Sequence, residues 1–196
     1  MPDAKSINTI DMPSGSDAWA LDFNITPKWV VPGWAGKSGT ASPSSGNLFY
    51  SPIHVSVSTS YDYLGIKVQG AAAGGSLARL GIYEDDGGKP GDLLLDAGTV
   101  AIDSTGVKQI AISQTLLGYY WMAYVSDGQA TLYYIDEESA AHAPGSGQYD
   151  SYVYRSYLSF YKTGQSGLVA AGLSDPATQP DQDIVGYGPF IMLREA

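Results

Sequence analysis

Hydrophobic and polar residues alternate with a period of two along much of this chain, which is typical of β-strands with one buried face. In the clearest case Ala78, Leu80 and Ile82 point one way, while the residues between them point the other way. Glycine and acidic residues dominate the next segment, 84–91, and a second strand pattern follows it. The stretch 77–100 therefore predicts a β-hairpin with an exposed acidic turn.

The same alternation recurs at short intervals, and turn residues separate nearly all of the segments. We expect about eight to ten strands in total, most of them antiparallel, in sheets with one face exposed to solvent. This pattern predicts an all-β fold, an antiparallel β-sandwich of the jelly-roll-like kind with an extended N-terminal arm. The expected strands are 48–57, 63–68, 77–83, 93–95, 99–102, 107–112, 119–125, 130–135, 152–158 and 189–193.

Residues 1–28 lack a sustained period and are interpreted as the arm, whereas 29–196 form the sandwich module. The arm has too many apolar residues for pure disorder, but they are too scattered for a core, so we expect it to dock on another surface. A neighbouring subunit is one candidate. Its docking residues are predicted to be Trp19, Leu21, Phe23 and Ile25.

Three other segments lack strand patterns. Residues 29–46 indicate a loop anchored by Trp29 and Trp34, and 164–188 indicate a long loop before the closing strand. The segment 137–143 is the one stretch whose pattern fits a helical turn.

Composition narrows the possible functions. The chain has 196 residues, which is enough for one substantial core, and its 24 glycines and 11 prolines fit punctuated strands rather than long helices. Its net charge of −10, with no basic cluster, argues against binding to nucleic acid or to anionic lipid. Without cysteine there is no disulfide or thiolate site, and we expect neither a secretory signal nor insertion into a membrane.

The candidate catalytic motifs are incomplete, and we expect a protein that is not an enzyme and holds no cofactor or metal. Gly36-Lys37-Ser38 imitates a phosphate-binding loop, but Val31 stands where the earlier glycine is needed. His54 and His142 could act as catalytic bases only beside a nucleophilic serine, and the sequence lacks the Gly-x-Ser-x-Gly motif that presents such a serine. A glycosidase-like carboxylate pair among the 20 acidic residues stays open, as does calcium at the acidic turn Glu84–Asp86, where a plain hairpin turn is favoured.

A stretch rich in tyrosine is the strongest surface signal. Its predicted contact residues are Tyr149, Tyr152, Tyr154 and Tyr157. Rigid amphipathic rings of this kind suit stacking on sugars or a subunit contact, although tyrosine also favours half-buried strands for purely structural reasons.

A series of short motifs runs in a fixed order from Trp29 to Ala196. The motifs are Phe49-Tyr50-Ser51-Pro52, Tyr61-Asp62, Leu64-Gly65-Ile66, Arg79 to Tyr83, Gly87-Gly88 with Pro90-Gly91, Leu95 to Val100, Ser104 to Val107, Gly118 to Ala123 and Pro189 to Arg194. Together they resemble the β-sandwich modules of tailed-bacteriophage fibre and other virion proteins. The resemblance implies a jelly-roll-like module on the virion surface, but it supplies no catalytic residues.

Three functions follow from this resemblance. The first is a tail-fibre-like module, a homotrimer that attaches to host cell-surface glycan. The second is a capsid decoration or cement protein, whose arm reaches over other virion proteins and stabilises the shell. The third is a polysaccharide-cleaving tail enzyme, which requires a close carboxylate pair.

Overall fold

A computed structural model of the chain describes residues 29–30, 38–136, 159–180, 182–185 and 187–196. Within them the chain is almost entirely antiparallel β-structure, which confirms the predicted all-β, sandwich-like fold. The elements are β1 (Trp29–Val30), β2 (Ser38–Ala41), β3 (Leu48–Gly70), β4 (Leu77–Asp85), β5 (Pro90–Ala101), β6 (Gly106–Ser126), β7 (Thr131–Asp136), β8 (Ser159–Lys162), α1 (Leu168–Ala171), β9 (Gln182–Val185), β10 (Tyr187–Pro189) and β11 (Ile191–Glu195).

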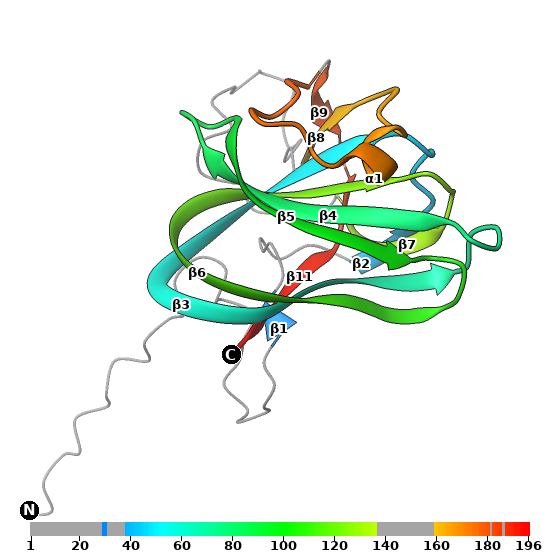
Figure 1. Cartoon of the computed structure of the whole chain (residues 1–196), viewed down its shortest axis with the longest axis horizontal. Helices are drawn as coiled ribbons and strands as arrows, with labels where there is room; N and C mark the ends of the chain where they lie inside the picture. Colours follow the sequence, from blue (N-terminus) through cyan, green and yellow to red (C-terminus); the bar gives the residue numbers. More distant parts are fainter. Residues whose placement is uncertain (1–28, 31–37, 137–158, 181, 186) are drawn as a thin grey trace, which may run out of the picture.

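Two long strands, β3 and β6, pair with each other through both layers of the sandwich. Their ladder runs from Phe49↔Tyr124 to Val68↔Gly106 and shifts register between Val55 and Thr59. At this shift both strands curve together, as the left side of Figure 1 shows. On one side of the bend β6 pairs with β4, and on the other side β3 pairs with β11, so the strand order is β1-β11-β3-β6-β4-β5.

The sequence predicts each of these long strands as two shorter ones, and that boundary is wrong. The polar residues at 58–60 resemble a turn, but in the structure strand pairing resumes at Thr59 after the register shift. In β6, Gly118 has φ +107°, a backbone conformation that glycine adopts without strain. The chain therefore turns the corner inside its strands rather than through loops.

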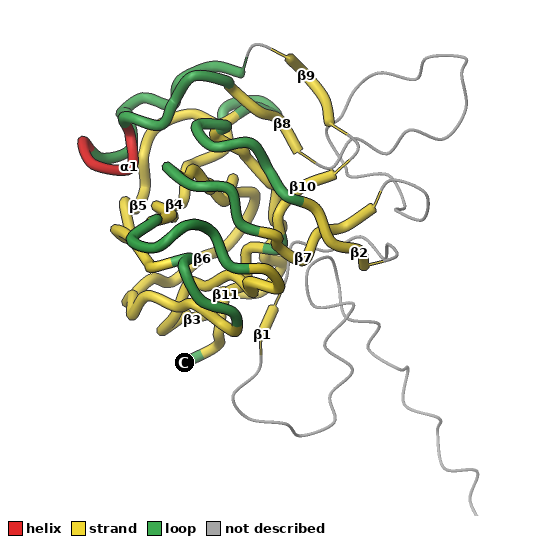
Figure 2. The backbone as a smooth tube through the Cα atoms, turned by 90° about the vertical axis from the view of Figure 1, so that its right-hand side faces the viewer, coloured by secondary structure: helices red, strands yellow, loops and turns green. Residues whose placement is uncertain are grey.

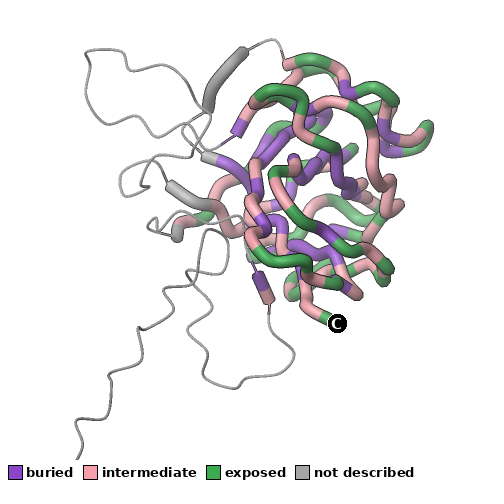
Figure 3. Tube along the Cα trace, turned by 90° about the vertical axis from the view of Figure 1, so that its left-hand side faces the viewer, coloured by how far each residue is buried: buried purple, intermediate pink, exposed green. Residues whose placement is uncertain are grey.

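The main core lies between the two layers. One face of each layer contributes fully buried apolar residues, so that strand segments far apart in the sequence meet across the core (Figure 3). The alternation predicted for Ala78, Leu80 and Ile82 is confirmed, since all three are fully buried in this core. Burial of apolar surface at roughly 25 cal/mol per Å² makes this core the main source of stability.

A second core covers the outer face of β4 and the adjoining halves of β3 and β6. Leu48, Tyr83, Trp121, Val169 and Leu173 belong to it. Strand β8 pairs with β3, and the segment 163–180 that follows, which we call the covering segment, packs on the outside of this layer. Figure 2 shows α1 at the rim of the strands. The predicted long loop at 164–188 thus contains α1, β9 and the start of β10, and its residues Val169, Leu173 and Ala177 enter the second core.

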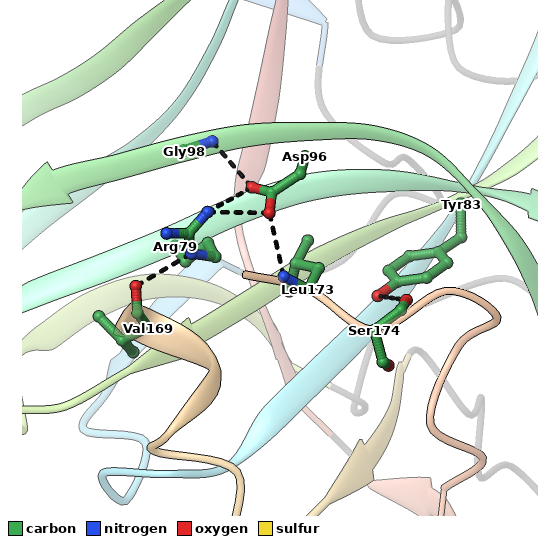
Figure 4. A network of polar contacts seen from close by, with 7 residues as sticks. All are labelled: Arg79, Tyr83, Asp96, Gly98, Val169, Leu173 and Ser174. Atoms are coloured by element: carbon green, nitrogen blue, oxygen red, sulfur yellow. Dashed lines mark hydrogen bonds and ion pairs between the residues drawn. The ribbon is translucent and has the colours of Figure 1, made fainter. Parts of the chain in front are cut away.

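Polar contacts fix this segment to the β4–β5 hairpin (Figure 4). Arg79 Nη1 donates to both carboxylate oxygens of Asp96 at 2.8 Å, and its Nε donates to the Val169 carbonyl at 3.0 Å. The Leu173 amide donates to Asp96 Oδ2 at 3.0 Å, and the Gly98 amide donates to Oδ1 at 3.0 Å. Asp96 therefore joins the hairpin, the arginine and the covering segment.

Two tyrosines in the second core also hold the covering segment. The Tyr50 and Tyr83 rings meet edge to face with centroids 5.4 Å apart. The Tyr83 hydroxyl donates to the Ser174 carbonyl at 2.9 Å and the Tyr50 hydroxyl to the Thr178 carbonyl at 3.0 Å. Burial raises the pKa of Tyr83 to about 12, and the pKa of Tyr50 is raised further, so both stay neutral donors.

Candidate functional site

The contact residues predicted from the sequence lie outside the described residues. This applies to Tyr149, Tyr152, Tyr154 and Tyr157, and equally to the arm residues Trp19, Leu21, Phe23 and Ile25. The helical turn at 137–143 and His142 also fall there. Glycan contact by the tyrosines and docking by the arm therefore stay predictions.

The acidic turn is a hairpin turn whose central carboxylate is engaged by protein donors. Trp121 Nε1 donates to Asp85 Oδ1 at 2.8 Å, and the Gly88 amide donates to the same carboxylate at 3.1 and 3.2 Å. The Asp86 amide closes the turn by donating to the Lys89 carbonyl at 2.8 Å. Among the described residues there is no group of three or more side chains suited to holding a metal.

His54 is engaged by an aromatic neighbour. Its ring stacks on Tyr119, the residue opposite it on β6, with centroids 4.2 Å apart and an interplanar angle of 26°. This stacking places the two rings side by side on the surface of the sheet.

A different set of residues gathers on the outer face of the layer that contains β1 and β11. Cross-strand pairing places them in two adjacent rows, because residues opposite each other in an antiparallel ladder share a face. One row contains Met192, Gly65 and Gln109 with the Trp29 indole beside it, and the next contains Arg194, Tyr63 and Ala111. We call Trp29, Tyr63, Gln109, Arg194 and Asp62 the aromatic face.

Gly65 lies beside the tip of the Trp29 indole. A Cβ atom at position 65 would lie 2.8 Å from the Lys108 carbonyl oxygen and 3.4 Å from both the Trp29 ring and the Gln109 Cβ. The 2.8 Å approach to the Lys108 carbonyl oxygen is what requires glycine here, whereas 3.4 Å to the indole tip is an ordinary van der Waals contact. This contact fixes the half-buried tryptophan against the sheet at the point where β1 begins.

Arg194 organises the second row. Its Cζ lies 3.9 Å from the centroid of the Tyr63 ring, within the range of a cation–π contact. Its Nε donates to Asp62 Oδ1 at 2.7 Å and its Nη2 donates to Asp62 Oδ2, so the ion pair is bidentate. The hydrogen bond from Arg194 holds the pKa of the Asp62 carboxyl below its ordinary value, so the pair stays charged at neutral pH.

The aromatic face combines rings with fixed polar groups. Rings of Trp and Tyr stack on the apolar faces of sugars, while an amide, a guanidinium and a carboxylate form directional hydrogen bonds with hydroxyl groups. Gln109 is exposed, whereas Trp29, Tyr63, Arg194 and Asp62 are half-buried and held by the contacts above. The arrangement suits recognition of a polar ligand with flat apolar patches.

Part of this face can be predicted from the sequence. Alternation places Tyr63, Gly65 and Lys67 on one side of their strand, opposite the buried Leu64 and Ile66. The missing information is the register, because Trp29 and Arg194 reach the face only through pairing of β1 with β11 and of β11 with β3. These pairings join residues from opposite ends of the chain.

Comparisons with protein-family models, with curated proteins and with solved structures gave no match. In the described part of the chain, no helix has both the length and the apolar character needed to cross a bilayer.

Proposed function

We propose that this chain is a non-enzymatic surface protein of a bacteriophage particle, whose sandwich attaches to host cell-surface glycan. The observation that carries the proposal is the aromatic face, in which Trp29 and Tyr63 lie beside the Arg194–Asp62 pair on neighbouring strands. The order of motifs that resembles phage virion modules supports the same assignment. A homotrimer on the particle would present this face several times and raise its avidity.

The rigidity of the aromatic face supports a binding role. Each of its fixed residues is held by another before a ligand arrives: Trp29 by the backbone at Gly65, and Tyr63 by Arg194. Preorganised side chains lose little conformational freedom on binding, so more of the contact energy becomes affinity. The net charge of −10 favours neutral or cationic sugars over polyanionic ones.

Glycan-array binding tests this proposal. We expect the full chain to bind a defined set of host glycans, and Tyr63→Ala and Gln109→Ala to weaken binding about tenfold or more, as loss of a stacking or hydrogen-bonding contact does. Tyr119→Ala is the matched control, because it removes an exposed tyrosine from another surface. Recovery of the bound glycan with unchanged length distinguishes attachment from cleavage.

Two results would overturn the role of the aromatic face. One is binding that the Tyr63 and Gln109 substitutions leave unchanged, and the other is no binding to any glycan tested. The double variant Tyr152→Ala, Tyr154→Ala, run on the same array, tests the tyrosine stretch independently. Loss of binding in that variant alone would move the contact to the tyrosine stretch.

A further inference from the structure

An apolar patch lies on the outside of the bend in β3 and β6. Val57, Leu117 and Tyr119 are 64, 59 and 46% exposed, and they are three of the four large hydrophobic residues exposed in the described part of the chain. His54 stacks on Tyr119 at 4.2 Å and adds a second ring. We call these four residues the bend patch. A cluster of exposed apolar side chains on a soluble protein marks a contact surface.

The direction of β1 points toward this patch. β1 runs antiparallel to β11 with Trp29 opposite Arg194 and Val30 opposite Leu193, so the step from Val30 to Trp29 points toward Glu195 and Ala196. The Ala196 amide donates to the Ser60 carbonyl at 2.9 Å, which places that end of β11 beside the bend. Val57 lies three residues before Ser60 on β3.

The sequence of the arm complements the patch. The arm as a whole lacks a sustained period, but over the seven residues 19–25 the order Trp-Ala-Leu-Asp-Phe-Asn-Ile places a large apolar residue at every second position. This period gives an extended segment one apolar edge and one polar edge. In a continuous strand these apolar positions share a face with Trp29, whose indole lies on the outer surface of the sheet.

We propose that residues 19–25 dock on the bend patch of their own chain, with Trp19, Leu21, Phe23 and Ile25 covering Val57, Leu117 and Tyr119. The reach is sufficient. Val57 lies ~20 Å along β3 from Tyr63, which is in the same cross-strand row as Trp29, and β1 lies ~10 Å from β3 across the sheet. An extended strand from Trp19 to Trp29 spans up to ~33 Å, which is longer than the distance to be covered. The arm is then a strap over the corner of the sandwich, a role that goes beyond glycan attachment.

Disulfide trapping tests the strap directly, because the chain contains no cysteine and each introduced pair is unique. We would combine Val57→Cys in turn with Leu21→Cys, Phe23→Cys and Ile25→Cys. At least one pair should form an intrachain disulfide about tenfold faster than the same arm cysteine paired with Val107→Cys. Val107 is a matched control since it is 51% exposed on β6 and lies ~20 Å from Trp29, as Val57 does.

Each other outcome overturns the proposal. Equal rates with positions 57 and 107 would describe an arm that samples the surface without docking. Disulfide-linked dimers formed in preference to intrachain links would identify the arm of a second copy as the occupant. Absence of links from all three arm positions would leave the patch for another partner, as the capsid-decoration alternative requires.

Limited proteolysis provides an equilibrium measurement on otherwise unmodified protein. Chymotrypsin cleaves after large apolar and aromatic residues, and a docked segment resists cleavage because its backbone is held. Leu117→Gln should raise the rate of cleavage within residues 19–25 several-fold, whereas Val107→Gln should leave it unchanged. A cleavage rate that is insensitive to Leu117→Gln would contradict docking. The Leu117→Gln variant should still bind glycan, because Leu117 is not part of the aromatic face, so failure of the docking proposal and failure of the glycan-binding proposal can be told apart.

Discussion

At the scale of single residues, Asp96 has the most consequential polar contacts. Its carboxylate accepts from Arg79 and from the backbone of Gly98 and Leu173, which belong to β5 and to the covering segment. The ion pair is largely but not fully buried, since the side chains of Arg79 and Asp96 are 16 and 24% exposed. Replacing the carboxylate by the amide of asparagine would leave the donors of Arg79, Gly98 and Leu173 facing a side chain that cannot accept from all three.

We therefore expect Asp96→Asn to lower the free energy of unfolding by about 1–3 kcal/mol, a range reduced for the partial exposure of the pair. Asp92→Asn is the control, because Asp92 is exposed on the same strand and the substitution removes the same charge. Chemical denaturation of both variants measures the difference. Equal stabilities would show that the Asp96 network contributes nothing beyond net charge.

The same carboxyl makes stability dependent on pH. Burial raises the pKa of Asp96, but hydrogen bonds from Leu173, Arg79 and Gly98 outweigh it, so the folded pKa lies below the ordinary 3.8. A lowered folded pKa stabilises the fold above the ordinary value, and that stabilisation is lost as pH falls below 3.8 and through the folded pKa. The free energy of unfolding, measured from pH 6 downward, should decline in this window. The decline should be smaller in Asp96→Asn, and an identical decline would assign it to other carboxyls.

At the scale of elements, the bend in β3 and β6 decides how the two layers form. Val55 pairs with Gly118, and the ladder resumes at Thr59↔Leu116, so extra residues of β3 bulge outward opposite a glycine with φ +107°. Space for a side chain exists there, since nothing lies within 4 Å of the position a Cβ would take. The backbone conformation, rather than packing, sets the requirement for glycine.

Gly118→Ala should therefore destabilise the protein by about 1–2 kcal/mol through backbone strain alone. Gly167→Ala is a suitable control, because its φ of −60° is open to any residue and its Cβ would also meet open space. Thermal unfolding of the two variants provides the measurement. A neutral Gly118→Ala would mean that the bend relaxes without cost.

The sequence predicted strands well where one face is buried and poorly where the chain departs from that pattern. The hairpin 77–100 follows from local alternation and turn residues, and the structure has it as β4 and β5. The helix at 168–171 has no helical period of its own and depends on Val169 entering the second core. The aromatic face depends on register between distant strands, which no local pattern specifies.

At the scale of the whole molecule, the two layers are not independent units. β3 and β6 pass through both, and the main core draws residues from each. The second core attaches 159–180 to one layer through Leu173 and Tyr83 as well as Asp96. Unfolding one layer therefore exposes the core face of the other.

We expect the sandwich to unfold in one transition. Far-ultraviolet circular dichroism reports the strands, and near-ultraviolet circular dichroism reports packed aromatic residues such as Trp121, which stacks on Phe160 at 4.9 Å. The two signals should change at the same denaturant concentration, as they do when no intermediate is populated. Separate midpoints would indicate that the covering segment or one layer unfolds first.

The continuous pairing of β3 with β6 also has a mechanical consequence. Layers connected by loops can be peeled apart one contact at a time, but here the connection is the ladder itself, with pairs on both sides of the bend. Sliding one strand along the other loads many hydrogen bonds together, because these bonds lie across the strands. A load applied between the two layers would pass through this shared pair, and the sandwich would yield only when those bonds fail together.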